Sequence, residues 1–154
     1  MTGRRPGVAR RGGRRRPLAA LLVVVLAVLV SGCSGTPEPQ EPGPGDAPGE
    51  VTVGPDGVQS ITLVSSDDYR FVPAMFSVLP GQVRVTLDNL AVQLTHSLAF
   101  PPGRSPSDIA ESIPVVAPSE SDTIEFSIST PGEYAFICSF HEALGHTGVM
   151  TVAG

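Results

Sequence analysis

The stretch Gly132-Glu-Tyr-Ala-Phe-Ile-Cys138-Ser-Phe-His141-Glu-Ala-Leu-Gly-His146-Thr-Gly-Val-Met150 lies close to the C-terminus. Apolar residues alternate before Cys138 and again after His146, which indicates two strands joined by a short loop. A soft thiolate and two imidazoles in one loop suit a thiophilic metal that also accepts nitrogen ligands. The stretch therefore predicts a metal site between two strands, with copper as the first choice and zinc as the second.

The chain before this stretch alternates in the same way, in short segments that end at turn residues such as Pro80-Gly81 and Pro131-Gly132. One helical turn is expected over 105–111, with Ser105 as its cap and Pro106 at its first position. The expected strands are 58–64, 69–73, 75–79, 82–89, 95–100, 121–128, 132–138 and 147–152. Seven to eight short strands with regular turns predict an all-β fold, an antiparallel β-sandwich over residues 58–154.

The first 32 residues have the composition of a secretory signal peptide. Seven arginines precede Leu18–Val30, an apolar run of thirteen residues, which is shorter than the roughly 20 residues of a membrane-spanning helix. The tetrad Val30-Ser-Gly-Cys33 that follows resembles a bacterial lipobox, in which the cysteine becomes the lipidated N-terminus. We expect a signal over 1–32 and lipidation of Cys33; the alternative is an uncleaved signal anchor with an incidental cysteine.

Residues 33–57 are rich in proline, glycine and acids and hold almost no apolar side chains. Such a segment buries too little surface to order itself. We expect it to be a disordered tether that lifts the domain from the membrane; the alternative is a passive tail.

Without residues 1–32, three arginines and fifteen acids leave a formal charge of −12. That surface repels nucleic acid and anionic lipid headgroups, so membrane attachment is expected through the lipid anchor only. The exported chain would also have Cys138 as its single unmodified cysteine. A lone thiol in an oxidising compartment needs burial or a ligand, which favours the metal site over a core cysteine.

Four motifs occur in order along 58–154. They are Tyr69-x-Phe71-x-Pro73, Val78-x-Pro80-Gly81, His96-Ser97-Leu98-x-Phe100 and Pro131-Gly132-x-Tyr134-x-Phe136-x-Cys138-Ser139-x-His141. The combination resembles the cupredoxins, the blue copper proteins, and most of all their plastocyanin and pseudoazurin branch. The resemblance implies a Greek-key β-sandwich, one copper ion that cycles between Cu(I) and Cu(II), and a role as an electron carrier rather than an enzyme.

The resemblance also implies the ligands. His96, Cys138 and His141 would form the trigonal plane, and family members add a weak axial ligand that is often methionine. The axial position eight residues after Cys138 holds His146 here, whereas Met150 follows four residues later. Three arrangements are open: His146 binds axially, His146 turns to solvent, or the loop shifts register and Met150 binds. The glycines beside His146 favour the first.

An axial imidazole donates more strongly than a thioether. If the resemblance holds and His146 replaces the axial methionine, the copper should have a lower reduction potential, and its colour should move from blue toward green or red. Ser97 replaces a frequent asparagine, and its hydroxyl is expected to brace the loop at Cys138. Asp67 and Asp68 are interpreted as solvated turn residues.

A redox protein partner is expected to dock near His141, Phe140 and Leu144, although the two apolar residues alternatively cap the core. The leading hypothesis is a membrane-tethered, extracytoplasmic electron carrier. The alternatives are copper storage or delivery without redox turnover, and a zinc-binding or structural domain. No phosphate-binding loop or nucleophile elbow indicates an enzyme.

Overall fold

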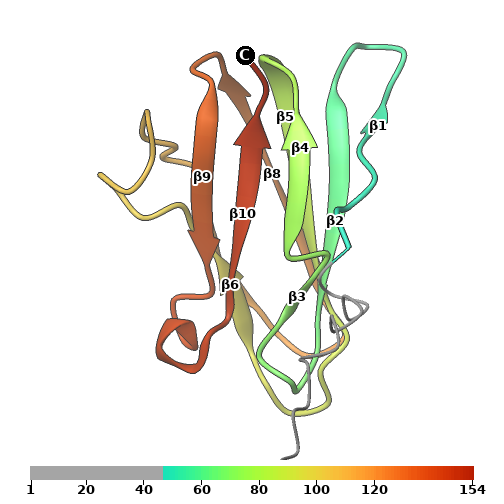
Figure 1. Ribbon diagram of the computed structural model, residues 1–154. Coiled ribbons are helices and arrows are strands. Elements are labelled where there is room, and N and C mark those ends of the chain that lie inside the picture. Colours follow the sequence, from blue (N-terminus) through green and yellow to red (C-terminus); the bar gives the residue numbers. More distant parts are fainter. Residues whose placement is uncertain (1–46) are drawn as a thin grey trace, which may run out of the picture. The chain divides into compact units, whose positions relative to one another are not determined.

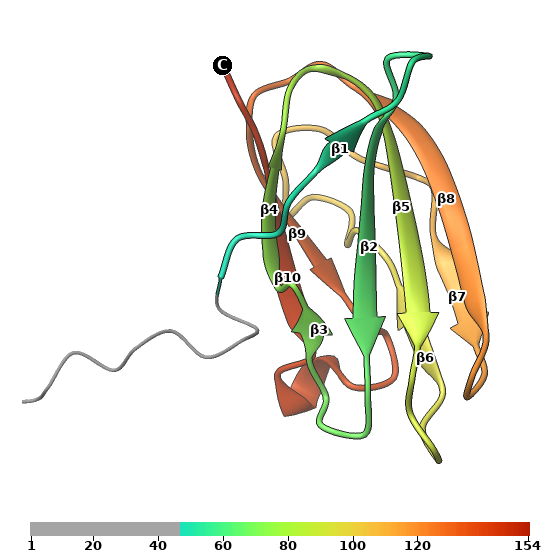
Figure 2. The same ribbon diagram turned by 90° about the vertical axis from the view of Figure 1, so that its right-hand side faces the viewer.

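The computed structural model describes residues 47–154, and in this range the strands form two main sheets packed face to face (Figures 1 and 2). The helical element in the same range is one 3₁₀ turn, η1 (Glu142–Leu144). The strands are β1 (Thr52–Val53), β2 (Gln59–Ser65), β3 (Phe71–Val72), β4 (Met75–Val78), β5 (Gly81–Asn89), β6 (His96–Leu98), β7 (Ile113–Val116), β8 (Ser121–Ile128), β9 (Gly132–Ile137) and β10 (Thr147–Val152). The predicted signal 1–32, the lipidated Cys33 and the tether residues before 47 lie outside the described residues.

One sheet has the order β1-β2-β5-β8, with β3 also paired to β2, and the facing sheet has the order β4-β10-β9. Strands β6 and β7 form a separate pair. The predicted β-sandwich is therefore confirmed. Its purely antiparallel character is corrected, because β2 pairs with β5, and β4 with β10, in parallel. The chain leaves β2, crosses to the other sheet as β4 and returns as β5, so β2 and β5 run in the same direction.

The described residues form ten strands instead of the expected seven to eight: β1 and β7 are the additions, and β3 covers only two residues of the strand expected over 69–73. Strand β7 contains Pro114, which weakens its strand signal. The helical turn expected over 105–111 is wrong: the chain bends at 105–107 and is irregular over 108–111. There the Asp108 carboxylate accepts a hydrogen bond from the Gly103 amide and folds the segment back on itself, with 2.9 Å between the atoms.

The domain begins earlier than its predicted start at residue 58. Strand β1 pairs with β2, and the Gly49 amide donates to the Met75 carbonyl at 2.6 Å. A Cβ at Gly49 would lie 2.2 Å from Pro73 Cγ, so this close approach requires glycine. The expected disordered tether is therefore corrected at residues 49–53. Their pairing rests on backbone hydrogen bonds, which an apolar count does not detect.

The core lies between the sheets and consists of the inward-facing residues of each strand, such as Leu63 of β2 and Val85 of β5, both fully buried. Aromatic rings extend it: Phe71 meets Phe136 with centroids 5.2 Å apart. Buried polar side chains gather mainly at one end of the sandwich, where β2 ends and β6 begins; they are Ser65, Asn89, His96, Ser97 and His146. Within the described range, no helix is long and apolar enough to cross a membrane.

Candidate metal centre

Four side chains converge at this polar end. In the ribbon diagram it is the end that carries the red loop between β9 and β10 (Figure 1). One donor atom from each of His96, Cys138, His141 and His146 lies within 4.8 Å of the other three. His96 begins β6, Cys138 follows β9, His141 precedes η1, and His146 stands between η1 and β10. His141 is half-buried and the other three are buried. The structure thus brings together the four residues that the sequence singled out.

The loop from Cys138 to His146 closes on itself through its backbone. The Cys138 amide donates to the His146 carbonyl at 3.0 Å, and the His141 amide donates to the Cys138 carbonyl at 3.0 Å. Gly145 ends η1 in the left-handed region, with φ of 87°, which a residue with a side chain rarely adopts. Because β9 and β10 pair directly at Ile137 and Thr147, the loop must turn within nine residues, which holds its three donors together.

The segment before His96 is held by a carboxylate. Asp67 accepts hydrogen bonds from the amides of Val92, Gln93 and Leu94 at 2.9, 3.2 and 3.1 Å. The bond from Val92, together with the other two, lowers the pKa of Asp67. Asp67 is an exposed turn residue, as interpreted from the sequence, and the three hydrogen bonds give it an additional structural role. Sequence alone could not reveal it, because its partners lie 25 to 27 residues away.

The ring of His96 is oriented by the backbone. Its Nε2 lies 2.9 Å from the Ser66 carbonyl oxygen, which can only accept, so Nε2 carries the proton. The lone pair is therefore on Nδ1, which faces Cys138 Sγ at 3.9 Å. His141 presents its Nδ1 to the same sulfur at 3.5 Å. Both imidazoles thus direct a nitrogen at the thiol.

His146 is fully buried, and its Nε2 lies 3.1 Å from Ser65 Oγ. Its Nδ1 is also buried and has no hydrogen-bond partner among the described residues. An unsatisfied buried polar atom costs about 1–3 kcal/mol, which a metal ligated there would offset. This nitrogen without a partner fits the role of a fourth ligand. Because His146 is buried, the structure does not have the alternative arrangement in which His146 turns to solvent.

Met150 lies in β10, opposite Tyr134 of β9, and is fully buried in the core. Tyr134 precedes Cys138 by four residues, and a strand rises about 3.3 Å per residue. This pairing places Met150 about four strand residues away from the four donors. The shift of register that would let Met150 bind the metal is therefore not the arrangement in this structure.

Ser97 supplies the brace expected of it. Its hydroxyl lies 3.7 Å from Cys138 Sγ, toward which it donates, and accepts from the Ser139 amide at 2.8 Å. The sulfur and the residue after it are thus tied to β6. Such outer contacts orient ligands and tune their donor strength.

Burial favours the neutral form of two of the histidines, His96 and His146, and a metal needs that form. Burial, with smaller contributions from His96 and His141, lowers the pKa of His146 to about 3. Burial likewise lowers the pKa of His96. Because a protonated imidazole cannot ligate, both shifts favour metal binding at neutral pH.

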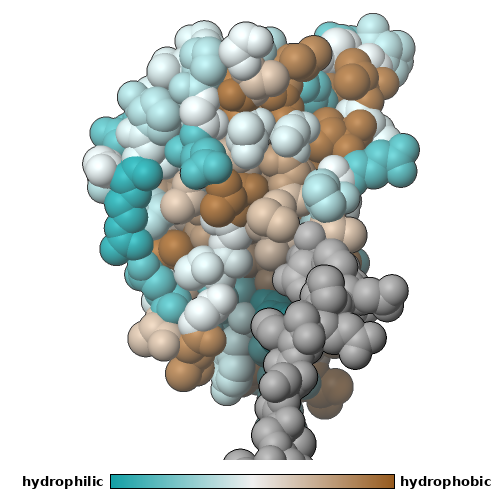
Figure 3. All heavy atoms as spheres, in the orientation of Figure 1, coloured by the Kyte–Doolittle hydropathy of each residue, from teal (hydrophilic) through white to brown (hydrophobic). Residues whose placement is uncertain are grey.

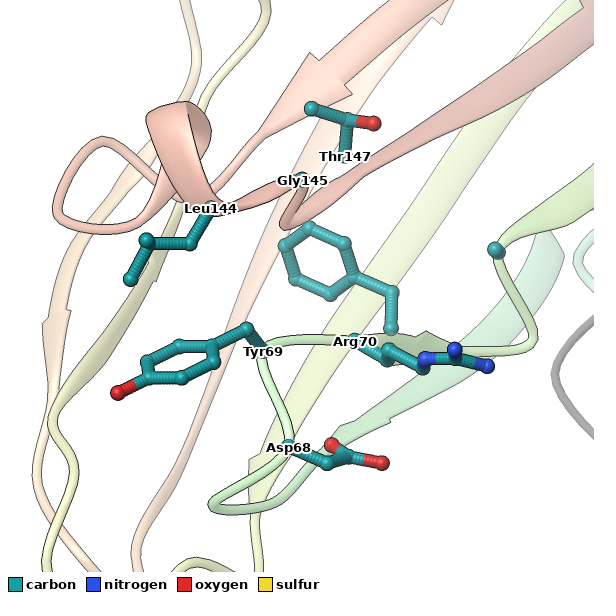
Figure 4. A pocket seen from close by; sticks show the side chains of 8 residues that line it. Asp68, Tyr69, Arg70, Leu144, Gly145 and Thr147 are labelled. Carbon is teal, nitrogen blue, oxygen red and sulfur yellow. The ribbon is translucent and has the colours of Figure 1, made fainter. Parts of the chain in front are cut away.

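A pocket of about 520 Å³ opens beside the centre, between the η1 loop and the turn before β3 (Figure 4). The side chains of Tyr69 and Leu144 lie on one side of the pocket, whereas those of Arg70 and Asp68 extend toward the other side. The pocket ends at Phe71, whose ring contacts His146 with centroids 4.1 Å apart. Its polar groups do not converge on one point.

Comparison with known proteins agrees with this geometry. Residues 58–153 match the family described as "Copper binding proteins, plastocyanin/azurin family". The chloroplastic plastocyanin minor isoform of Arabidopsis thaliana is 31% identical over 97 residues, which is 58% of this chain and 56% of that protein. Plastocyanin B'/B'' of Nicotiana tabacum is 33% identical over 97 residues, 58% of this chain and 96% of the relative. The chain thus spans about half the length of the first of these relatives.

Among solved structures, dithionite-reduced auracyanin from Roseiflexus castenholzii superposes with a TM-score of 0.54 at 26% identity, covering 62% of this chain and 97% of that one. Auracyanin A from Chloroflexus aurantiacus, described as a "blue" copper protein, gives 0.52 at 17% identity over 63% of this chain and all of that one, and shares the fold. Together with the four converging donors, these matches show that the chain belongs to the plastocyanin/azurin family of copper-binding proteins, the cupredoxins, and that its cofactor is copper.

Proposed function

We propose that this protein is an extracytoplasmic carrier of single electrons, with copper held by His96, Cys138, His141 and, as fourth ligand, His146. Bound copper supplies a centre that alternates between Cu(II) and Cu(I). The observation that carries the proposal is the convergence of one thiolate and three imidazoles within 4.8 Å, three of the four side chains being buried.

The surrounding residues suit electron transfer because they hold the donors in one arrangement. His96 is tied to the Ser66 carbonyl, Cys138 to Ser97, and the ligand loop to its own backbone. Ligands fixed in this way move little when the charge of the metal changes. A small rearrangement lowers the barrier to electron transfer in both directions.

Electrons would enter and leave through His141, the half-buried member of the group. Beside it Phe140 and Leu144 are 53% and 59% exposed. Figure 3 shows brown, apolar surface at the end of the molecule where η1 lies in Figure 1. A redox protein partner would dock on this surface, which needs no charge complementarity and places the partner close to the metal.

Attachment to the membrane belongs to the same proposal. It rests on the signal-like residues 1–32 and the lipobox-like cysteine at position 33. A lipid on Cys33 would keep the carrier at the membrane surface. Mass spectrometry of the mature protein tests this; an unmodified N-terminus upstream of Cys33 contradicts it.

The test of the function is copper loading of the full mature chain, followed by visible and EPR spectra and voltammetry. We expect one copper per chain, a sulfur-to-copper charge-transfer spectrum and reversible one-electron cycling. His146→Met should raise the potential and move the colour toward blue, since a thioether donates more weakly than an imidazole. A spectrum unchanged in His146→Ala contradicts ligation by His146.

The same four donors would complete a closed tetrahedral zinc site. Metal analysis of protein matured in its own compartment distinguishes the two, and zinc in place of copper contradicts the electron carrier. Irreversible voltammetry with rapid copper loss to a chelating acceptor would instead indicate storage or delivery.

A further inference from the structure

Ser65 occupies a position where the strand pattern calls for an apolar residue. The inward-facing residues of β2 include Ile61, Leu63 and Ser65, and Ser65 is 1% exposed. Its hydroxyl meets one polar side chain among the described residues, His146, with 3.1 Å between Oγ and Nε2. A buried hydroxyl without a partner costs about 1–3 kcal/mol, so this contact accounts for the serine.

We propose that Ser65 is a positioning residue for the fourth ligand: its hydroxyl accepts a hydrogen bond from Nε2–H of His146 and thereby directs the Nδ1 lone pair at the metal. The inference rests on the proposed function, in which His146 is that ligand. In this proposal Ser65 determines both the tautomer of the His146 imidazole and the orientation of its ring.

The tautomer follows from the two nitrogens. A neutral imidazole carries one proton, on either nitrogen. On Nδ1 of His146 the proton would be a buried donor without a partner, whereas on Nε2 it meets Ser65 Oγ. The Nε2–H tautomer therefore avoids the larger desolvation cost. His96 adopts the same tautomer through the carbonyl of Ser66, so two consecutive residues set both buried histidines.

The orientation follows from what else surrounds the ring. Phe71 contacts the ring of His146 with centroids 4.1 Å apart, and the ring of His96 contacts that of His146 with centroids 4.8 Å apart. These contacts restrict the tilt of the ring. The apolar face of Phe71, however, hardly distinguishes the ring from one rotated by half a turn, which would exchange Nδ1 with a carbon. Among the side chains around the ring, the hydroxyl of Ser65 makes that distinction, and the backbone of Arg70 is a second hydrogen-bonding group beside the imidazole.

The test compares Ser65→Ala with Ser65→Thr and Ser66→Ala in the full mature chain. Zn(II), which is redox-inert, reports affinity by competition with a chelator, and Cu(II) reports ligand field by EPR and visible spectra. Loss of an outer hydrogen bond to a metal-ligating histidine costs about 10- to 100-fold in affinity. We expect that loss in Ser65→Ala, with a spectrum moved toward that of His146→Ala.

Two variants serve as matched controls. Ser65→Thr keeps the hydroxyl and should restore both affinity and spectrum. Ser66→Ala removes a neighbouring hydroxyl but keeps the carbonyl that orients His96, so it should behave as wild type. Wild-type affinity and spectra in Ser65→Ala would overturn the proposal.

A second measurement needs no variant. Nitrogen-15 NMR of the metal-free wild-type chain should show the Nε2–H tautomer of His146, and the Nδ1–H tautomer overturns the proposal even if Ser65→Ala fails to fold. The variant His146→Ala distinguishes failure of the proposed ligand His146 from failure of the proposed role of Ser65. If its spectrum equals that of wild type, His146 is not a ligand and the role of Ser65 fails with it; if His146→Ala changes the spectrum and Ser65→Ala does not, only the role of Ser65 is lost.

Discussion

The ring of Tyr69 lies against the ring of His141, with centroids 5.0 Å apart and planes inclined by 58°. Tyr69 reaches this position with φ of 57°, in the left-handed region that side chains other than those of Asn and Asp rarely occupy. The turn between β2 and β3 thus places an aromatic ring against the most exposed of the four donors at the expense of backbone strain.

That relationship predicts an order among variants of Tyr69. Tyr69→Ala loses an aromatic contact, about 0.5–1.5 kcal/mol, and retains the strain. Tyr69→Gly loses the same contact but gains about 1 kcal/mol from relief of the left-handed conformation. Urea unfolding of the metal-free chain should therefore rank wild type and Gly above Ala, with Phe near wild type. An Ala variant more stable than Gly would contradict this reading of the turn.

The stability of the metal-free chain should rise with pH up to the ordinary range of histidine. The pKa of His146 is about 3 in the folded state and 6.5 in the unfolded state, so between these values the unfolded chain binds more protons. The free energy of unfolding therefore falls as the pH drops below 6.5, by at most about 1.4 kcal/mol per pH unit for one proton. The lowered pKa of His96 acts in the same direction.

Urea titrations between neutral and mildly acidic pH measure this slope. His146→Gln, which cannot titrate, should flatten it. Equal slopes for the two proteins would show that protonation of His146 is not linked to unfolding.

Removal of the Asp67 carboxylate should loosen the segment before His96. In Asp67→Ala, the amides of Val92, Gln93 and Leu94 lose their acceptor. We expect faster hydrogen exchange at these amides and weaker Zn(II) binding, because His96 is then less well positioned. Asp68→Ala is the matched control, since the adjacent carboxylate makes none of these bonds. Slow exchange preserved in Asp67→Ala would contradict the role.

Ser97 should raise the reduction potential, because a hydrogen bond donated to the Cys138 sulfur withdraws electron density and favours Cu(I). Ser97→Ala removes that donor, and also the acceptor of the Ser139 amide. Voltammetry should give a lower potential for Ala and a value near wild type for Thr, which keeps the hydroxyl. An unchanged or higher potential in Ala would be inconsistent with this contact.

The apolar surface at η1 should govern electron exchange between oxidised and reduced copies of the chain. Leu144→Asp places a charge where two copies would meet, so NMR line broadening in mixed-oxidation samples should report slower exchange. Val53, 67% exposed on β1 at the opposite end of the sandwich, offers the control Val53→Asp (Figure 1). Equal slowing by both substitutions would show a general charge effect instead of a docking surface.

Much of the sandwich is readable from local pattern. Strands β8 and β10 have the predicted bounds, because alternation over six to eight residues identifies one buried face. The parallel pairing of β2 with β5 and the addition of β1 were not predictable in this way. They depend on which sheet the chain crosses to and on backbone hydrogen bonds, neither of which leaves a side-chain pattern.

The sequence by itself determined the donors: Cys138, His141 and His146 are grouped by a loop of nine residues, and the family pattern supplied His96. Only the tertiary structure decided how they face the metal. The inward direction of His146 Nδ1 depends on Ser65, which is 81 residues away in the chain, and on the contact with Phe71. Spacing limits how far apart donors can lie, whereas the direction of a lone pair is decided by the partner of the opposite ring nitrogen.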